Sequence, residues 1–385
     1  MFMEKPPRLI SLDAFRGFTM MSMVLVNNPG SWEKIYQQLE HASWHGWTFT
    51  DTIFPSFLWI VGVAMTFSFA VRKGKGDSNS AIIVQAFRRA AIIFGLGLFL
   101  SCFPFGLIGK STFDLATVRI PGVLQRIAIC YFFSTLVYLY FSVRGQIAII
   151  VGLLSSYWVM MKFIPVPGIV LGNLEANSNF ASYIDSIFLK GHMWKYTCTW
   201  DPEGIISTIP SLATTLAGIL TGEYLRTSSH SAEEKTSWMF VFSAGLLFIG
   251  AFLSFWMPIN KSLWTSTYAI FMAGWSLGLF AVFYFLIDAK GYQKWSFPCI
   301  VFGMNAIFIY VLSSIQENIL SNISVSVQNP DSAASSLSLK DCIYHRFLLV
   351  HFEPLNASLV YALLTVFSIG LIAWVMYRKK WFIKV

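Results

Sequence analysis

Residues 51–71 read DTIFPSFLWIVGVAMTFSFAV, and they decide the fold of this chain. After Asp51 the stretch contains no charged side chain for twenty residues, until Arg72 and Lys73 follow it. A helix needs about 20 residues to cross the hydrocarbon core of a bilayer. The stretch therefore predicts a transmembrane helix that begins at a carboxylate and ends at two basic side chains.

The composition extends this prediction to the whole chain. Of 385 residues, 56% are hydrophobic and only 12% are charged, whereas roughly 25% of the residues in a soluble domain are charged. So few polar side chains cannot cover a chain of this length, and much of its surface must face lipid. We predict an all-α polytopic integral membrane protein.

Nine further stretches have a similar apolar character and length. We expect about ten transmembrane helices, at 10–29, 51–71, 82–103, 119–141, 146–164, 204–222, 238–257, 264–287, 297–319 and 356–377. The stretch 204–222 is the weakest because it is rich in Ser, Thr and Gly, but small residues often mark close contacts between helices. With no internal repeat and no soluble segment, residues 1–385 read as a single transmembrane domain.

The distribution of Lys and Arg predicts the orientation. If ten spans alternate, most basic side chains fall on one side, which should be cytoplasmic. Both termini are then cytoplasmic, and segments 30–50, 104–118, 165–203 and 320–355 lie outside. We expect 30–50, 165–203 and 320–355 to form an extracytoplasmic rim. The net charge of +8 is explained by this bias, so we predict no nucleic-acid partner.

The first outer loop carries the strongest chemical signal. His41 and His45 lie four residues apart, just before Asp51. Asp51 is placed either to cap the following helix or to orient a histidine. A neutral imidazole beside a carboxylate can act as a general base or accept an acyl group, although His41 can equally be an interfacial histidine packed on Trp44. Gly46 interrupts a helix here and no third ligand is adjacent, so we predict no metal.

Charged residues inside the spans are the second signal, because they normally face a cavity or a partner. Asp13 and Arg16 are spaced to pair on one helix face. Arg88 and Arg89 are adjacent and should point in different directions, so that one faces inward. Arg126, next to Gln125, lies too deep to reach the surface easily.

These arginines suit a polyanionic ligand, since guanidinium matches phosphate in a bidentate fork. A structural alternative is a buried ion pair with Asp201 or Glu203, or polar contact between helices. Asp201 and Glu203 themselves suit a helix start and can also hold an amine substrate. Asn305 is either a helix contact or a ligand contact.

Several ordered motifs together resemble a known family. They are RLISLDAFRG (8–17), VN (26–27), HASW (41–44), Asp51, FP (54–55), IPGVLQR (120–126), DPEG (201–204) and GMN (303–305). In this order they are similar to the heparan-α-glucosaminide N-acetyltransferase family of transmembrane acetyltransferases. The resemblance runs across most of the chain.

The resemblance implies transfer of an acetyl group from cytosolic acetyl-CoA to the amine of a glucosamine on the far side of the membrane. It implies that His41 is the active-site histidine and matches Asn27 and Asp51 to the family's asparagine and aspartate. His45 departs from the family pattern, which favours His41. We expect no metal in this reaction.

These inferences assign roles to particular residues. His41 would act as base or acetyl carrier, Asp51 would fix its tautomer, and Asn27 would bind the thioester oxyanion. Acetyl-CoA would be bound by Arg16, Arg88, Arg89, Gln125, Arg126 and Asn305. The acceptor would contact Trp44, Asp201 and Glu203.

The alternative function is a transporter or channel for an anionic solute or a lipid-linked glycan. Against it, the sequence shows no repeat and no matching pair of broken helices. We expect membrane lipid and an amino-sugar or glycan acceptor as partners, and the sequence leaves a homodimer open. With no evident sorting signal, we expect the protein in a bacterial inner membrane.

Overall fold

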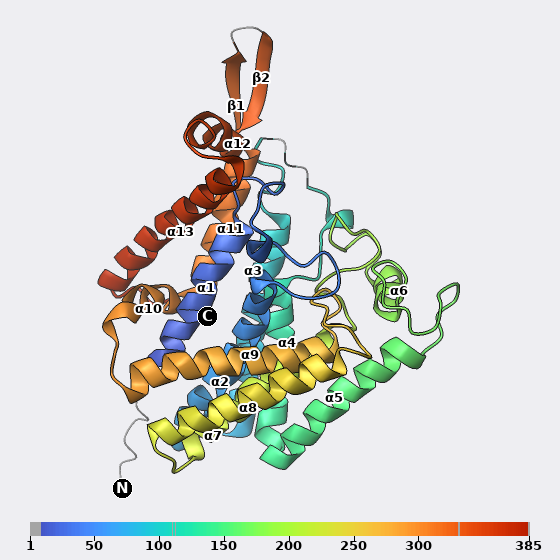
Figure 1. Cartoon of the computed structure of the whole chain (residues 1–385), viewed down its shortest axis with the longest axis vertical. Helices are drawn as coiled ribbons and strands as arrows, with labels where there is room; N and C mark the ends of the chain where they lie inside the picture. The colour runs from blue at the N-terminus through green and yellow to red at the C-terminus, as the bar shows by residue number, and fades with distance from the viewer. Residues whose placement is uncertain (1–8, 110, 112, 330–331, 384–385) are drawn as a thin grey trace.

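The computed structural model describes residues 9–109, 111, 113–329 and 332–383, without the side chains of 327–335, and this part of the chain is almost entirely helical. The helices long enough to organise the fold are α1 (Ile10–Asn27), α2 (Phe49–Gly74), α3 (Asn79–Cys102), α4 (Val123–Tyr140), α5 (Val143–Phe163), α7 (Thr208–Thr227), α8 (Ala232–Leu253), α9 (Ser266–Tyr284), α11 (Ala306–Asn322) and α13 (Pro354–Arg378). Two shorter helices, α6 (Phe180–Phe188) and α10 (Phe297–Gly303), lie between them. The predicted all-α class is confirmed (Figure 1).

Seven helices in the described residues are long and apolar enough to cross a membrane, or eight if α10 and α11 form one bent span. Each of the ten expected stretches contains a helix, but α1 and α7 are not among those seven. In α1 the apolar run is interrupted by Asp13 and Arg16, and α7 is rich in Ser and Thr. The apolar helices mark an integral membrane protein, while the number ten stays a prediction.

The small residues of α7 explain why this weakly apolar helix lies in the bundle. A Cβ added at Gly218 would lie 2.0 Å from the Trp59 carbonyl oxygen, and one added at Gly62 would lie 2.0 Å from the Thr215 carbonyl oxygen. The backbones of α2 and α7 can therefore approach only because both positions lack a side chain. Helix α2, which carries Asp51, therefore packs closely against α7.

The expectation of one continuous helix over 297–319 is wrong. The chain bends by 71° between Lys294–Gly303 and Ala306–Asn322. At the break, the Gly303 carbonyl accepts a hydrogen bond of 2.8 Å from Arg16 Nε on α1. A side chain from a distant helix thus supplies the donor that a continuous helix would have provided from its own backbone.

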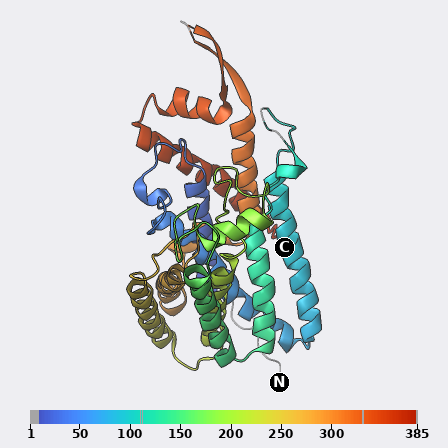
Figure 2. The ribbon, with the colours of Figure 1, turned by 90° about the vertical axis from the view of Figure 1, so that its right-hand side faces the viewer.

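The long outer segments are structured. Segment 165–203 contains α6, and segment 320–355 contains an antiparallel hairpin of β1 (Ser324–Asn329) and β2 (Ser332–Ser338), with Ser324 paired to Ser338. The helix α12 (Leu339–Cys342) and a π-helical turn (Ile343–Leu348) follow. Figure 2 shows the hairpin projecting beyond the helical body.

The loops fall on two sides of the bundle. In Figure 1, parts of the segments expected outside, namely the loop within 30–50, α6 within 165–203 and the hairpin within 320–355, lie along the upper and right-hand side. The turns between α4 and α5 and between α7 and α8 lie along the lower side. The helices thus alternate in direction as expected, and which side faces the cytosol stays a prediction.

Candidate active site

The site forms where the first outer loop meets the start of α2. Asp51 lies in the first turn of α2 and completes a capping box with Thr48. Its Oδ1 accepts a hydrogen bond of 2.6 Å from His41 Nδ1, and its Oδ2 accepts bonds of 3.0 Å from the amides of Ala42 and Thr48. Asp51 therefore both caps the helix and orients His41, so the two roles considered from the sequence coexist.

The Asp51 bond sets the chemistry of His41. An ionised carboxylate can only accept hydrogen bonds, so the proton lies on Nδ1 and a neutral ring keeps its lone pair on Nε2. The His41 side chain is 49% exposed, which leaves Nε2 open to a reactant. Nearby Lys261 and partial withdrawal from solvent lower the pKa of His41, against the opposing effect of Asp51. Neutral His41 is the form that accepts a proton or an acyl group.

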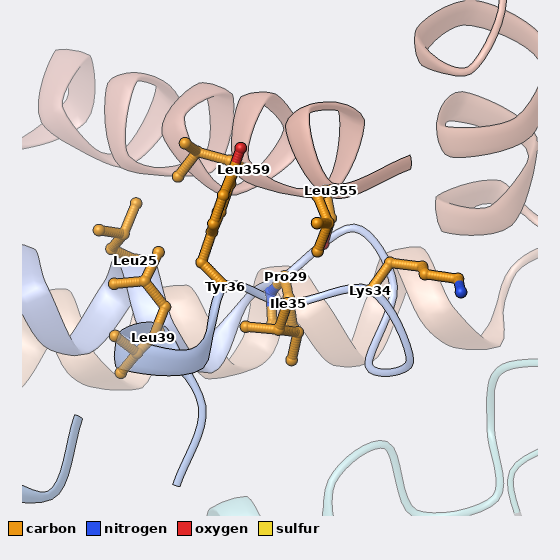
Figure 3. Close-up of a pocket in the computed structure, with 11 residues that line it drawn as sticks. Leu25, Pro29, Lys34, Ile35, Tyr36, Leu39, Leu355 and Leu359 are labelled. Atoms are coloured by element: carbon orange, nitrogen blue, oxygen red, sulfur yellow. The ribbon is translucent and has the colours of Figure 1, made fainter. Parts of the chain in front are cut away.

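The loop that carries His41 is also held at its other end, on α13. Figure 3 shows Tyr36 reaching from the loop to α13 beside Leu359, and Leu25, Leu39 and Leu355 are among the residues that line a small pocket there. The pocket has a volume of about 10 Å³, which is barely room for one water molecule, so it is a packing contact and not a ligand site. The Tyr36 hydroxyl donates a hydrogen bond of 2.6 Å to Asn356 Oδ1 beside it.

Trp44, on the loop that carries His41, packs against Trp200. The rings of Trp44 and Trp200 meet edge to face with centroids 5.1 Å apart, and Trp44 Nε1 donates to the Leu174 carbonyl at 3.0 Å. His45 instead has its Nε2 3.7 Å from the Glu175 carboxylate. The structure therefore pairs His41, and not His45, with Asp51, and gives the site an aromatic wall.

Asp201 and Glu203 form a buried cluster with Arg119. Arg119 Nε and Nη2 donate to the two Asp201 oxygens at 2.8 and 2.6 Å, and Nη2 donates to Glu203 Oε2 at 2.6 Å. The alternative that Arg126 pairs with one of these carboxylates is wrong, because Arg119 does so. Burial raises the pKa of Glu203, but Arg119 and Lys261 outweigh it and hold that pKa below its usual value.

A cavity of about 530 Å³ lies deeper in the bundle, among α1, α2, α3, α4 and the α10–α11 break. Arg16, Arg88, Arg89 and Asn305 line it. Both adjacent arginines, of which we expected one to face inward, line the cavity, although Arg88 is exposed and Arg89 is half-buried. Arg89 Nε is buried without a hydrogen-bond partner among the described residues, and its guanidinium lies over the ring of Tyr131, another lining residue, with 4.9 Å between Cζ and the ring centroid.

The cavity approaches the site along α2. Its lining on α2 runs from Phe57 to Phe69, and Phe57 lies six residues after Asp51. At 1.5 Å of rise per residue, its upper end is about 9 Å along the helix from Asp51. An elongated ligand bound by the arginines would therefore extend toward His41.

Asn305 lines the cavity, and both polar atoms of its side chain are already hydrogen-bonded within the protein. Its amide donates to the Trp381 carbonyl at 3.0 Å and its carbonyl accepts from the Ile383 amide at 2.9 Å. Ile383 also lines the cavity. Asn305 thus ties the tail after α13 to the cavity wall.

Three other predicted residues lie elsewhere. Gln125 and Arg126 are buried but are not part of the cavity lining. Asn27 is the last residue of α1 and is exposed, and no hydrogen bond joins it to His41 within the described chain. Its assignment to the oxyanion stays a prediction.

Some residues at the site were missed by reasoning from sequence. Arg119 directly precedes the IPGVLQR motif, and a charge at the start of a span was a usable signal. Lys261 is an ordinary loop lysine in the sequence, and Gln85 is one polar residue in a long helix. Nothing local indicated that Lys261 would lie near His41 or that Gln85 would line the cavity.

The fold and site define a polytopic membrane protein with a histidine–aspartate pair at one end of its bundle and an arginine-lined cavity beneath. The chain belongs to the heparan-alpha-glucosaminide N-acetyltransferase catalytic family, whose model matches residues 8–260. The resemblance inferred from the motifs is thereby confirmed.

Two relatives show how much is shared. The chain is 28% identical to the human heparan-alpha-glucosaminide N-acetyltransferase over 99% of its own length and 60% of the relative's. It is 26% identical to the mouse protein of the same name, over 81% of its own length and 54% of the relative's. The chain thus spans a little over half the length of these relatives.

Proposed function

We propose that the protein is a transmembrane N-acetyltransferase that uses acetyl-CoA from the cytoplasmic side and acetylates the amine of a glucosamine-type sugar on the opposite side. The observation that carries this proposal is the His41–Asp51 pair, joined at 2.6 Å at the end of a bundle that also encloses an arginine-lined cavity. Membership of the acetyltransferase family supports the reaction type.

The chemistry follows from the tautomer of His41. In direct transfer, Nε2 removes a proton from the amine as its nitrogen attacks the thioester carbonyl. The bond from carbon to sulfur then breaks, and the thiolate of CoA leaves with its electron pair. In the alternative, Nε2 itself attacks the carbonyl, the bond from carbon to sulfur breaks, and the CoA thiolate leaves. Nε2 then carries the acetyl group until the amine displaces it, and the released imidazole takes up the amine proton. In both routes, Asp51 stabilises the ring as it gains positive charge.

The cavity fits a phosphate-bearing donor. Arg16, Arg88 and Arg89 line it, and a guanidinium binds phosphate oxygens through paired hydrogen bonds. The unsatisfied Nε of Arg89 would gain an acceptor from such a ligand. A thioester arm rising along α2 would then place its reacting carbon near His41.

The acceptor would enter between the two tryptophans and the Arg119 cluster. A half-buried indole such as Trp44 or Trp200 offers an apolar face to a sugar ring. The negative charge of Glu203 raises the pKa of His41. The lowered pKa of Glu203 keeps its carboxylate negative. A negative carboxylate there would attract a protonated amine before His41 receives the proton.

Purified protein in detergent provides the test. Isothermal titration should show acetyl-CoA binding, and mass spectrometry should show labelled acetyl on the nitrogen of glucosamine. Among sugars, glucose is the matched control because it lacks the amine. Absence of both binding and transfer would refute the proposal, whereas binding with transfer to a different amine would replace only the acceptor.

A further inference from the structure

Arg126 is a buried cation that the cavity does not use. Its residue is 1% exposed, and Nη2 donates to Ser207 Oγ and, at 3.3 Å, to the Gly204 carbonyl. Nε and Nη1 have no hydrogen-bond partner among the described residues. The guanidinium instead lies over the ring of Trp264, with 5.1 Å between Cζ and the ring centroid. A cation–π contact is strengthened when both groups are withdrawn from water.

Trp264 has an unusual backbone conformation. It is fully buried and has a φ of +50°, a region that bulky side chains rarely adopt. Such a conformation persists only where the surroundings determine it, and it is concentrated at functional sites. The Trp264 ring packs edge to face on Tyr268 and on Phe54, with centroids 5.3 and 5.2 Å apart.

Tyr268 connects Arg126 and Trp264 to the His41–Asp51 pair. It is fully buried, and its hydroxyl donates a hydrogen bond of 2.5 Å to the backbone carbonyl of Asp51. The segment that precedes Trp264 also binds the loop that carries His41. Asn260 Nδ2 donates to the Trp44 carbonyl at 2.8 Å, and the Gly46 amide donates to the Ile259 carbonyl at 2.7 Å. The segment from Ile259 to Tyr268 thus contacts the chain on the C-terminal side of His41, at Trp44, Gly46 and Asp51.

We propose that Arg126 is a positioning residue that acts through Trp264 and Tyr268 on Asp51, and through Asp51 on His41. This role rests on the proposed acetyl transfer and replaces the expectation that Arg126 binds CoA. Arg126 fixes the plane of Trp264, Trp264 fixes the ring of Tyr268, and Tyr268 holds the first turn of α2. A small displacement of Asp51 would lengthen its bond to His41 Nδ1.

The sharpest test is Tyr268→Phe, which removes only the hydroxyl. We expect kcat to fall about tenfold or more, as misplacement of a catalytic group does, with an unchanged KM for acetyl-CoA. Tyr344→Phe is the matched control, because Tyr344 is also buried and its hydroxyl also donates to a backbone carbonyl, that of Pro354. The control should leave kcat unchanged.

The pKa of His41 gives a readout that does not depend on turnover. Asp51 on α2 and Glu203 before α7 raise this pKa, and Lys261 before α9 lowers it. A weaker bond to Asp51 should therefore lower it further in Tyr268→Phe. The pH dependence of His41 modification by diethyl pyrocarbonate, followed by peptide mass spectrometry, measures this shift even if acetyl transfer itself is refuted.

Arg126→Lys tests the first link, because it keeps the charge but loses the flat guanidinium. We expect a lower kcat, an unchanged dissociation constant for acetyl-CoA, and a double variant with Tyr268→Phe that is no worse than the poorer single variant. A weaker affinity for acetyl-CoA with unchanged kcat would make Arg126 a CoA ligand and overturn the proposal. An unchanged kcat together with an unchanged pKa of His41 in Tyr268→Phe would also overturn the proposal. If Arg126→Lys does not fold, the result for Tyr268→Phe decides whether the proposal stands.

Discussion

Replacing Asp51 with Asn changes one carboxylate oxygen into an amide nitrogen. Oδ2 receives two backbone donors, the amides of Ala42 and Thr48, so the amide oxygen must take that position. The amide nitrogen then faces His41 Nδ1, where the carboxylate now accepts at 2.6 Å. Two donors cannot pair, so the ring proton moves to Nε2. The variant therefore removes the lone pair that the reaction requires.

The size of the effect follows from these contacts. The same substitution in a Ser-His-Asp triad lowers kcat by about 10⁴ through the wrong tautomer, and we expect a loss of ~10³–10⁴ in Asp51→Asn, or about 4–5.5 kcal/mol of transition-state stabilisation. The amide oxygen keeps the two backbone bonds at Oδ2, so the capping box survives. The free energy of unfolding should fall by no more than about 1 kcal/mol.

The assay is the initial rate of labelled acetyl transfer to glucosamine at saturating acetyl-CoA, with the dissociation constant measured by titration. Asp114→Asn is the control, because Asp114 is exposed and its Oδ1 accepts a hydrogen bond from a helix-start amide, that of Ala116, at 2.9 Å. The control should keep its rate. A rate for Asp51→Asn within tenfold of the natural protein, with intact acetyl-CoA binding, would refute the tautomer argument.

Three further substitutions test the surroundings of the site. Lys261→Met removes the cation that most lowers the pKa of His41, so the acid limb of the pH–rate profile should move to higher pH, with loss of rate near pH 6 and none at pH 8. Arg89→Gln should raise the KM for acetyl-CoA about 10- to 100-fold, as expected for one charged hydrogen bond to phosphate, with little change in kcat. Arg119→Met leaves the fully buried Asp201 carboxylate unpaired, and the free energy of unfolding should fall by about 3–5 kcal/mol in thermal denaturation.

Each of these substitutions has a control and a contradicting result. Lys34→Met removes an exposed lysine of the loop that carries His41 and should leave the pH–rate profile in place. A profile that Lys261→Met also leaves unmoved would contradict the assigned cause. Arg144→Gln removes an exposed arginine outside the cavity lining. If it raises the KM as much as Arg89→Gln does, the cavity is not the donor site. An unchanged free energy of unfolding in Arg119→Met would mean that the cluster of Arg119, Asp201 and Glu203 does not stabilise the fold.

The sequence predicted the features that depend on local patterns. The helix expected over 51–71 is α2, at Phe49–Gly74, because an apolar run in lipid must satisfy its backbone hydrogen bonds within the helix. The His41–Asp51 contact was also accessible, since ten residues separate the two and the second occupies the first turn of a helix. A cap position and a nearby imidazole are both visible in a single sequence.

Features set by distant contacts could not be predicted. The break after Gly303 depends on a donor from Arg16, 287 residues away in the chain. The choice of Arg119 over Arg126 as the partner of Asp201 depends on where the start of α4 meets the turn before α7, across 82 residues. Arg119 and Arg126 lie only seven residues apart, so the sequence does not show which of them pairs with Asp201.

The central claim is that His41 transfers acetyl across the membrane. Protein reconstituted in vesicles, with glucosamine sealed inside and labelled acetyl-CoA added outside, tests it directly. We predict labelled N-acetylglucosamine in the lumen with the natural protein and none with His41→Ala, although that variant should still bind acetyl-CoA. Full luminal product with His41→Ala, or none with a natural protein that binds acetyl-CoA in the same vesicles, would contradict it.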